Sequence, residues 1–135
     1  MEKIIYNEKL YAIILRHSFK KKGVTFFTEN HLSQQLAFMN HPKGHIIEPH
    51  LHIPNKRIIY STQEVLCIKK GILKVNFYDE SKSYLGKEIL CKGDTILLIS
   101  GGHGFEVIEE IEMLEIKQGP FNHKNDKIRF NDTQP

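Results

Sequence analysis

Short apolar runs alternate along the chain with turn-forming residues. The runs are rich in β-branched, aromatic and aliphatic residues, and helical periodicity is nearly absent. Strands are predicted over residues 10–19, 24–28, 36–40, 46–52, 64–69, 72–78, 87–91, 95–99, 104–108 and 112–117. Gly, Pro, Asn and Asp separate them, as at Lys70-Gly71. For residues 30–35 the sequence is compatible with either a turn or a short helix capped by Asn30. The pattern predicts an all-β sandwich or barrel.

The length favours one domain over residues 1–135, because a second hydrophobic core would be too small to be stable alone. Hydrophobic residues make up 40% of the chain and charged residues 26%, which is typical of globular proteins and unlike disorder. No repeat or linker divides the chain. Residues 122–135 are polar, and we expect this C-terminal tail to lie partly across the barrel through Ile128 and Phe130.

The charge pattern gives little support to nucleic-acid binding. The formal net charge is +3, and the cations are scattered among acids except at Lys20-Lys21-Lys22, which we interpret as an exposed turn. No apolar stretch is long enough for a signal peptide or a membrane span, so a cytoplasmic protein is expected. Cys67 and Cys91 lack the C-x-x-C spacing, so two buried, reduced thiols are expected.

Three histidines and one glutamate are candidates for a metal site. Side chains at i and i+2 of a strand share a face, so His50 and His52 project together. Glu64 begins the next strand, on the same face as Leu66, and a hairpin can bring its carboxylate beside the two imidazoles. His103 follows a Gly-Gly turn, where a strand would place its ring at the mouth of a barrel.

This mixed set of nitrogen and oxygen ligands suits one divalent transition metal and leaves positions open for water or substrate. Ligand type does not distinguish Zn, Fe, Mn, Ni, Co and Cu. The alternative interpretation is that the four residues are ordinary polar side chains on the wet rim of a barrel, hydrogen-bonded to their neighbours. Both interpretations stay open on the residues alone.

The same residues resemble the first motif of the cupin superfamily, a glycine, an H-x-H pair, a glutamate and a second glycine. The corresponding residues here are Gly44, His50, His52, Glu64 and Gly71, with the family spacing from Gly44 to His50 and from Glu64 to Gly71. A longer segment, residues 53–63, replaces the short family loop. The second motif, an apolar strand, a glycine turn and a histidine, is similar to the run from residue 93 to residue 103.

The resemblance covers residues 34–120 and implies a cupin double-stranded β-helix, the jelly-roll barrel. The segments Thr62–Leu66, Ser100–Phe105 and Lys117–Phe121 look like those of small, single-domain bacterial cupins encoded in surface-polysaccharide and nucleotide-sugar gene clusters. That likeness implies carbohydrate chemistry in polysaccharide biosynthesis. The polar segment 53–63 carries Arg57, a candidate for binding an anionic sugar phosphate or uronate.

Three functions follow as hypotheses. The first is a metal-dependent isomerase or epimerase of sugars or nucleotide sugars, in which Glu64, Glu48 or Tyr60 moves the proton. The second is an iron-dependent dioxygenase, which the same ligands would support. The third is a non-catalytic module that binds or senses a sugar. A homodimer is expected, because outward apolar residues such as Leu51 and Val65 suit a partner chain.

Overall fold

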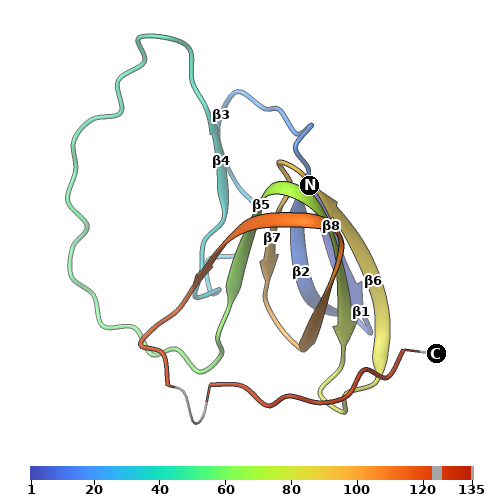
Figure 1. Cartoon of the computed structure of the whole chain (residues 1–135). Helices are drawn as coiled ribbons and strands as arrows, with labels where there is room; N and C mark the ends of the chain where they lie inside the picture. The colour runs from blue at the N-terminus through green and yellow to red at the C-terminus, as the bar shows by residue number, and fades with distance from the viewer. Residues whose placement is uncertain (123–125, 135) are drawn as a thin grey trace.

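The computed structural model of the chain describes residues 1–122 and 126–134, so positions 123–125 and 135 of the expected tail lie outside it. This part contains eight strands and no α-helix (Figure 1). They are β1 (Glu2–Tyr6), β2 (Lys9–Leu15), β3 (Gly23–Phe26), β4 (Ala37–Asn40), β5 (Glu64–Tyr78), β6 (Tyr84–Cys91), β7 (Thr95–Leu98) and β8 (Gly102–Lys117). No helix in the described ranges could cross a membrane.

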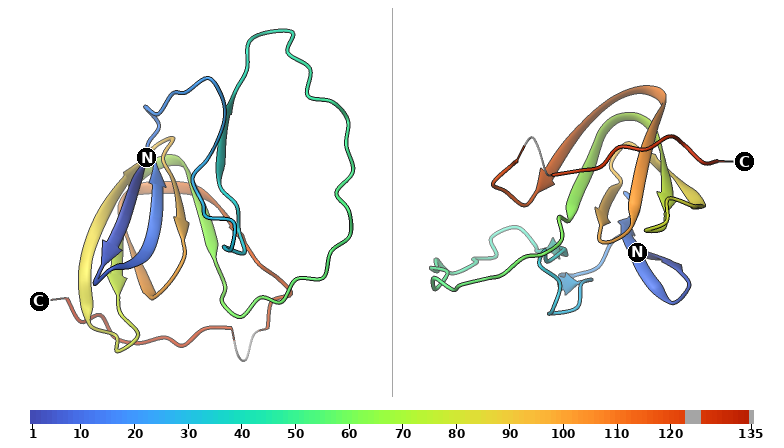
Figure 2. Two further views of the ribbon diagram at one scale, coloured as in Figure 1. Left: turned by 180° about the vertical axis from the view of Figure 1, so that it is seen from behind. Right: turned by 90° about the horizontal axis from the view of Figure 1, so that it is seen from below.

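Six strands form one strongly curled antiparallel sheet, and β3 and β4 form a separate hairpin. The sheet runs in the order β1-β2-β7-β5-β6, and β8 pairs with β5. One edge of β5 pairs with β7 and then with β6, while its other edge pairs with β8. Both β5 and β8 arch over, so the sheet is a half-barrel with an open end (Figures 1 and 2). The all-β prediction is therefore confirmed.

Period-two alternation decides which side chains enter the half-barrel. Ile14, Ile96 and Leu66 lie in register across β2, β7 and β5, and all three are fully buried in the main core. Their neighbours Ile13 and Leu97 face the opposite side, where a second apolar cluster packs. That cluster includes Phe27 and Phe38 from the β3–β4 region, so the hairpin covers the outer face of the sheet.

The bend in β5 falls at Gly71. Its φ is +85°, and a Cβ there would collide with the backbone carbonyl of Glu110 on β8. The pairing of β5 with β8 shifts register between Ile68 and Leu73, as a bulged strand does. For this reason the predicted strands 64–69 and 72–78 are one curved strand, and 104–108 and 112–117 are likewise parts of β8.

Arg16 and Asp94 connect β1 and β6, which lie at the two ends of the strand order of the curled sheet. The Arg16 guanidinium donates to Glu2 on β1 (2.8 and 2.9 Å), to the Ile89 carbonyl on β6 (2.6 Å) and to Asp94 (3.2 Å). Buried Asp94 also accepts from the backbone N–H groups of His17 (2.9 Å) and Cys91 (3.0 Å). Burial acts to raise the pKa of Asp94, but these hydrogen bonds and Arg16 outweigh it and lower the pKa below 3.8.

We expect Asp94→Asn to lower the free energy of unfolding by about 2–3 kcal/mol near neutral pH, because charge-assisted hydrogen bonds are lost and Arg16 loses its buried anionic partner. A lowered folded pKa contributes stability above the ordinary pKa, and that stability is lost as the pH falls through the folded value. Urea unfolding measured from pH 7 downward should therefore show that the difference in free energy of unfolding between wild type and variant shrinks below pH 3.8. Glu8→Gln, in an exposed turn, is the control. A difference between Asp94→Asn and wild type that does not change with pH would contradict the assignment of this stability to the ionised Asp94.

Several sequence predictions are wrong in detail. Residues 46–52 form no strand, because Pro49 and Pro54 lack the N–H groups that a ladder needs around this stretch. Residues 30–35 form turns and bends, without the helix, and β1 was not predicted. Both thiols are free, but Cys91 is exposed and Cys67 only half-buried.

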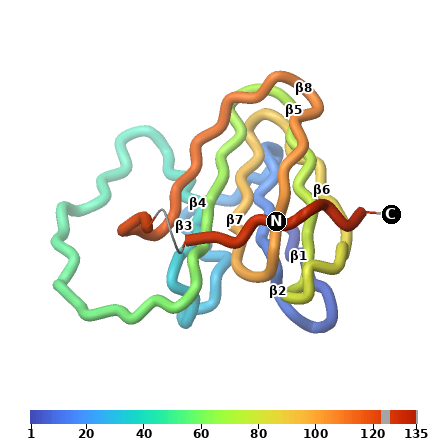
Figure 3. The backbone as a smooth tube through the Cα atoms, turned by 60° about the horizontal axis from the view of Figure 1, so that its bottom comes forward, coloured from blue at the N-terminus to red at the C-terminus, as the bar shows by residue number. Residues whose placement is uncertain are grey.

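Residues 41–63, which we call the arm, contain no strand and loop away from the sheet (Figures 1 and 3). The arm begins after β4 and ends where β5 starts. Its apolar side chains are exposed, among them Leu51 at 95%. In the described residues no strand covers the outer edge of β8, so the sheet is left as a half-barrel.

The C-terminal tail lies across the open end of the half-barrel (Figures 2 and 3). Phe130 packs edge-to-face on Tyr78, with ring centroids 5.2 Å apart. The Tyr78 hydroxyl donates to Asp132 (2.7 Å), and Thr133 donates to the carbonyl of Lys82 (2.7 Å). Ile128, expected to dock, is 82% exposed. Phe130, Asp132 and Thr133 thus hold the second half of the tail on the sheet.

Candidate functional site

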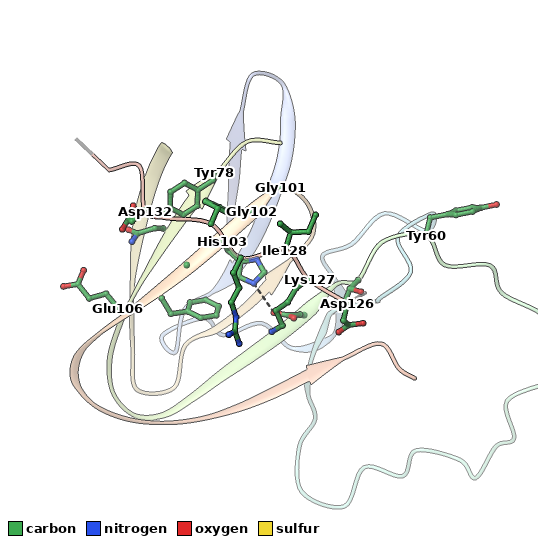
Figure 4. A pocket seen from close by; sticks show the side chains of 17 residues that line it. Tyr60, Tyr78, Gly101, Gly102, His103, Glu106, Asp126, Lys127, Ile128 and Asp132 are labelled. Atoms are coloured by element: carbon green, nitrogen blue, oxygen red, sulfur yellow. Dashed lines mark hydrogen bonds and ion pairs between the residues drawn. The ribbon is translucent and has the colours of Figure 1, made fainter. Parts of the chain in front are cut away.

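A cavity of about 970 Å³ opens between β5, β8 and the tail (Figure 4). The arched strands β5 and β8 form its walls, and residues 126–132 of the tail run along it. The polar side chains that line it include Glu64, Asn76, Tyr78, His103, Lys127 and Arg129. A smaller cavity of about 230 Å³ lies elsewhere, between residues 31–33 and the end of the arm.

Glu64 and His103 meet in this cavity although they come from different strands. Glu64 is in register with Leu98, on the face of β5 that points into the half-barrel. His103 is the second residue of β8, and the arch brings it across to Glu64. His103 Nε2 lies 3.2 Å from Glu64 Oε2, the dashed contact in Figure 4. Both side chains are mostly buried, so the pair is shielded from water on most sides.

The hydrogen bond from His103 lowers the pKa of Glu64. Burial opposes this effect, while the charge that His103 carries when protonated and the charges of Lys117 and Lys127 add to it. The carboxylate of Glu64 therefore stays ionised at neutral pH and can accept the Nε2 proton of His103. In the neutral imidazole a proton on Nε2 leaves the lone pair on Nδ1, which can take a proton from a ligand. A histidine oriented by a carboxylate is a common device for acid–base chemistry.

The tail supplies positive charge to the cavity. Lys127 and Arg129 are exposed along its wall, and neither forms an ion pair with any described residue. Lys117 is already engaged, with its Nζ 3.7 Å from Asp126 and 3.9 Å from Glu64. Acids, among them Asp126 and Asp132, line the same cavity, but the two cations form no ion pair with any described residue and could bind the anionic group of a ligand.

Asn76 and Tyr78 complete the polar lining. Asn76 is only 3% exposed, and within the described residues its Oδ1 accepts no hydrogen bond. Such a buried acceptor is rare without a partner, so it marks a place where a ligand hydroxyl or amide can donate. Burial, reinforced by the bond to Asp132, raises the pKa of Tyr78, which therefore stays protonated at neutral pH.

The other candidates from the sequence lie on the arm and are exposed: Glu48, His50, His52, Arg57 and Tyr60. The rings of His50 and His52 are close, with centroids 5.3 Å apart, and His50 Nδ1 donates to the Glu48 carbonyl (3.0 Å). Arg57 reaches only a backbone carbonyl of the arm. Tyr60 sits at the cavity rim but is 96% exposed and extends away from His103 (Figure 4).

The structure therefore brings together two of the four expected metal ligands. Within residues 1–122 and 126–134, no cluster of three or more His, Cys, Asp and Glu side chains could hold a metal ion. Glu64 and His103 face each other, while His50 and His52 remain on the arm. A single chain in this conformation does not fit the four-ligand set.

Sequence reasoning missed Asn76, Tyr78, Lys127 and Arg129 as site residues. The tail carried one usable signal, since cations alternate with apolar residues over Lys127-Ile128-Arg129-Phe130. In an extended segment such alternation places the cations on one face. Asn76 gave a weaker signal, a polar residue inside an apolar strand. Neither signal says which cavity the residue lines.

Comparisons with known proteins add no assignment to this geometry. Neither the protein-family models nor the curated proteins nor the solved structures contain a match to the chain. The site therefore stands on the residues and contacts described above.

Proposed function

We propose that the chain is an isomerase or epimerase of sugar or nucleotide-sugar metabolism, acting in the cavity between β5, β8 and the tail. The observation that carries the proposal is the contact of His103 with Glu64, 3.2 Å apart, in the wall of a cavity of about 970 Å³. The curled sheet agrees with a jelly-roll barrel of the cupin type, which we propose as the complete fold. The cupin-like motifs that contain both residues supply the link to carbohydrates.

The cavity matches the chemistry of an activated sugar. Its volume is at the upper end of the range for small-molecule sites and can accept a nucleotide-linked sugar. Lys127 and Arg129 can bind phosphate oxygens, and Asn76 can accept from a sugar hydroxyl. The aromatic rings of Tyr78 and Phe105 offer apolar surface to the sugar ring or base.

The proposed reaction is a proton shift next to a carbonyl. The Nδ1 atom of His103 takes the proton from the carbon beside the carbonyl, and an enolate forms on the substrate. Ionised Glu64 stabilises the resulting imidazolium through Nε2. Before it returns, this proton can exchange with solvent. Its return to the former carbonyl carbon, with transfer of the hydroxyl proton of the original carbon to the former carbonyl oxygen, gives the isomer. Its return to the original carbon after the enolate has turned its other face to Nδ1 gives the epimer, and both routes regenerate the imidazole.

Removing the two tail cations is expected to weaken substrate binding more than turnover. In Lys127→Gln/Arg129→Gln we expect KM for a nucleotide-linked keto-sugar to rise by about tenfold or more with little change in kcat, since two charge-assisted contacts to phosphate are lost. Steady-state kinetics over a panel of nucleotide-linked keto-sugars measures both constants. Lys20→Gln/Lys21→Gln, on an exposed loop, is matched in charge. An equal rise in KM in this control would contradict the assignment.

A metal remains a separate proposal, because the arm could supply His50 and His52 to Glu64 and His103 in another conformation. Elemental analysis of purified wild type and of His50→Ala/His52→Ala tests it directly. A stoichiometric divalent metal in wild type that is lost from the variant would support the four-residue set. Oxygen uptake with ferrous iron would then distinguish a dioxygenase from an isomerase.

A further inference from the structure

β8 presents an edge that no strand of the described residues covers. It pairs with β5 along its length, and nothing pairs with its other edge in the described ranges. Four large apolar side chains of β8 that do not line the cavity are 49–54% exposed: Val107, Ile108, Leu114 and Ile116. A long edge strand with exposed apolar side chains is a template onto which another strand can add.

The arm has exposed apolar side chains but pairs with no strand of the described residues. Over residues 46–60 it carries exposed apolar side chains, including Ile46, Leu51, Ile53 and Ile58, but it belongs to no strand. It joins β4 to β5, Gln63 at its end is hydrogen-bonded to Ser33 and Gln118, and between its ends it stands away from its own β8 (Figures 1 and 3). From His50 to Ile53 polar and apolar residues alternate, which suits a strand with one apolar face.

The two surfaces also have complementary charge. β8 carries five glutamates and one lysine, whereas the arm carries three cations, Lys43, Lys56 and Arg57, and one acid. Glu106 and Glu110 are paired with lysines of β5, but Glu109 and Glu112 form no ion pair with any described residue. The same holds for Lys56 and Arg57 among the described residues. Unpaired charges of opposite sign on two apolar segments favour their association.

We propose that the arm of one chain adds along the open edge of β8 in a second copy of this chain. Each copy has one arm and one open edge, so a reciprocal exchange satisfies both and closes as a two-fold dimer. A second copy is favoured over the chain's own edge, because in the single chain the arm already stands away from β8. The exchange would cover the exposed apolar residues of both segments. The inference is independent of the reaction proposed above.

Charge reversal on either surface tests the exchange. One variant, Lys56→Glu/Arg57→Glu, reverses the arm, and the other, Glu109→Lys/Glu112→Lys, reverses the edge. All four side chains are exposed, so both variants should fold, and circular dichroism with thermal melts checks this. By sedimentation equilibrium, wild type is expected at twice 15.8 kDa, and each variant alone should dissociate with a Kd raised about tenfold or more. Lys20→Glu/Lys21→Glu is a matched control that should stay dimeric.

A mixture of the two variants separates exchange between copies from folding back within one chain. In a mixed dimer the reversed arm meets the reversed edge, and the native arm meets the native edge, so both contacts are complementary. Native mass spectrometry should therefore show the mixed dimer, with dimer affinity restored. Two chains that stay monomeric when mixed would overturn the proposal, as would a wild type that stays at 15.8 kDa at about 100 μM.

Discussion

Replacing His103 with glutamine is expected to lower kcat on a nucleotide-linked keto-sugar by about 10²–10⁴-fold, the usual contribution of a positioned acid–base group. Glutamine keeps polar atoms near Glu64 but cannot take a proton from carbon. KM should change little, because the cations proposed to bind phosphate lie on the tail and not on β8. Steady-state kinetics on wild type and variant, with circular dichroism to verify folding, measures the effect.

Glu64→Gln serves as the comparison for His103→Gln. Glu64 acts through the imidazole, so its loss should reduce kcat less than the loss of His103. His50→Gln, on the exposed arm, should retain kcat if acid–base chemistry rests on His103. A wild-type rate in His103→Gln would remove His103 from the reaction.

The second large effect concerns stability. Phe77→Ala is expected to lower the free energy of unfolding by about 3–5 kcal/mol, because Phe77 is 1% exposed and is among the largest fully buried side chains of the core. It packs near Tyr6, with ring centroids 6.1 Å apart, and is in register with His103 on β8. The loss would leave a cavity beneath the strand that carries His103. Urea unfolding followed by circular dichroism gives the value.

Phe26→Ala is the control for this prediction. Phe26 is 61% exposed on β3, so its truncation should change the free energy of unfolding by about 0.5 kcal/mol or less. Similar losses in the two variants would show that the core does not lie inside the curl of β5 and β8. The contrast therefore measures where the apolar core sits, separately from any activity.

Local patterns in the sequence predicted the strands of the core except β1. Period-two alternation identified the face of β5 that carries Glu64 and Leu66, and the structure places both toward the interior. Glycine turns marked where strands end or bend, although Gly71 bends a continuous strand where an interruption was predicted. These features depend on neighbours in the chain, which is why the sequence reveals them.

Long-range features could not be predicted in the same way. His50 and His52 have the alternation of a strand, but no strand of the described residues pairs with them. Pro49 and Pro54 on either side lack the N–H groups that hydrogen bonds to a neighbouring strand require. The contact of Glu64 with His103 was expected, but it forms because the long strands β5 and β8 both curl and bring these two residues together. Lys127 and Arg129 reach the cavity only because Phe130 and Asp132 anchor the tail on Tyr78. Such positions follow from packing, which local patterns do not contain.

The most direct test of the proposed function is hydrogen exchange between substrate and solvent. Wild type is incubated in D₂O with each member of a panel of nucleotide-linked keto-sugars, and proton NMR follows the signals of the carbons beside the carbonyl. If His103 removes and returns a proton there, wild type should introduce deuterium into at least one of these sugars, and His103→Gln should introduce it about 10²-fold more slowly or not at all. Binding without any exchange, or exchange at the wild-type rate in His103→Gln, would contradict the account.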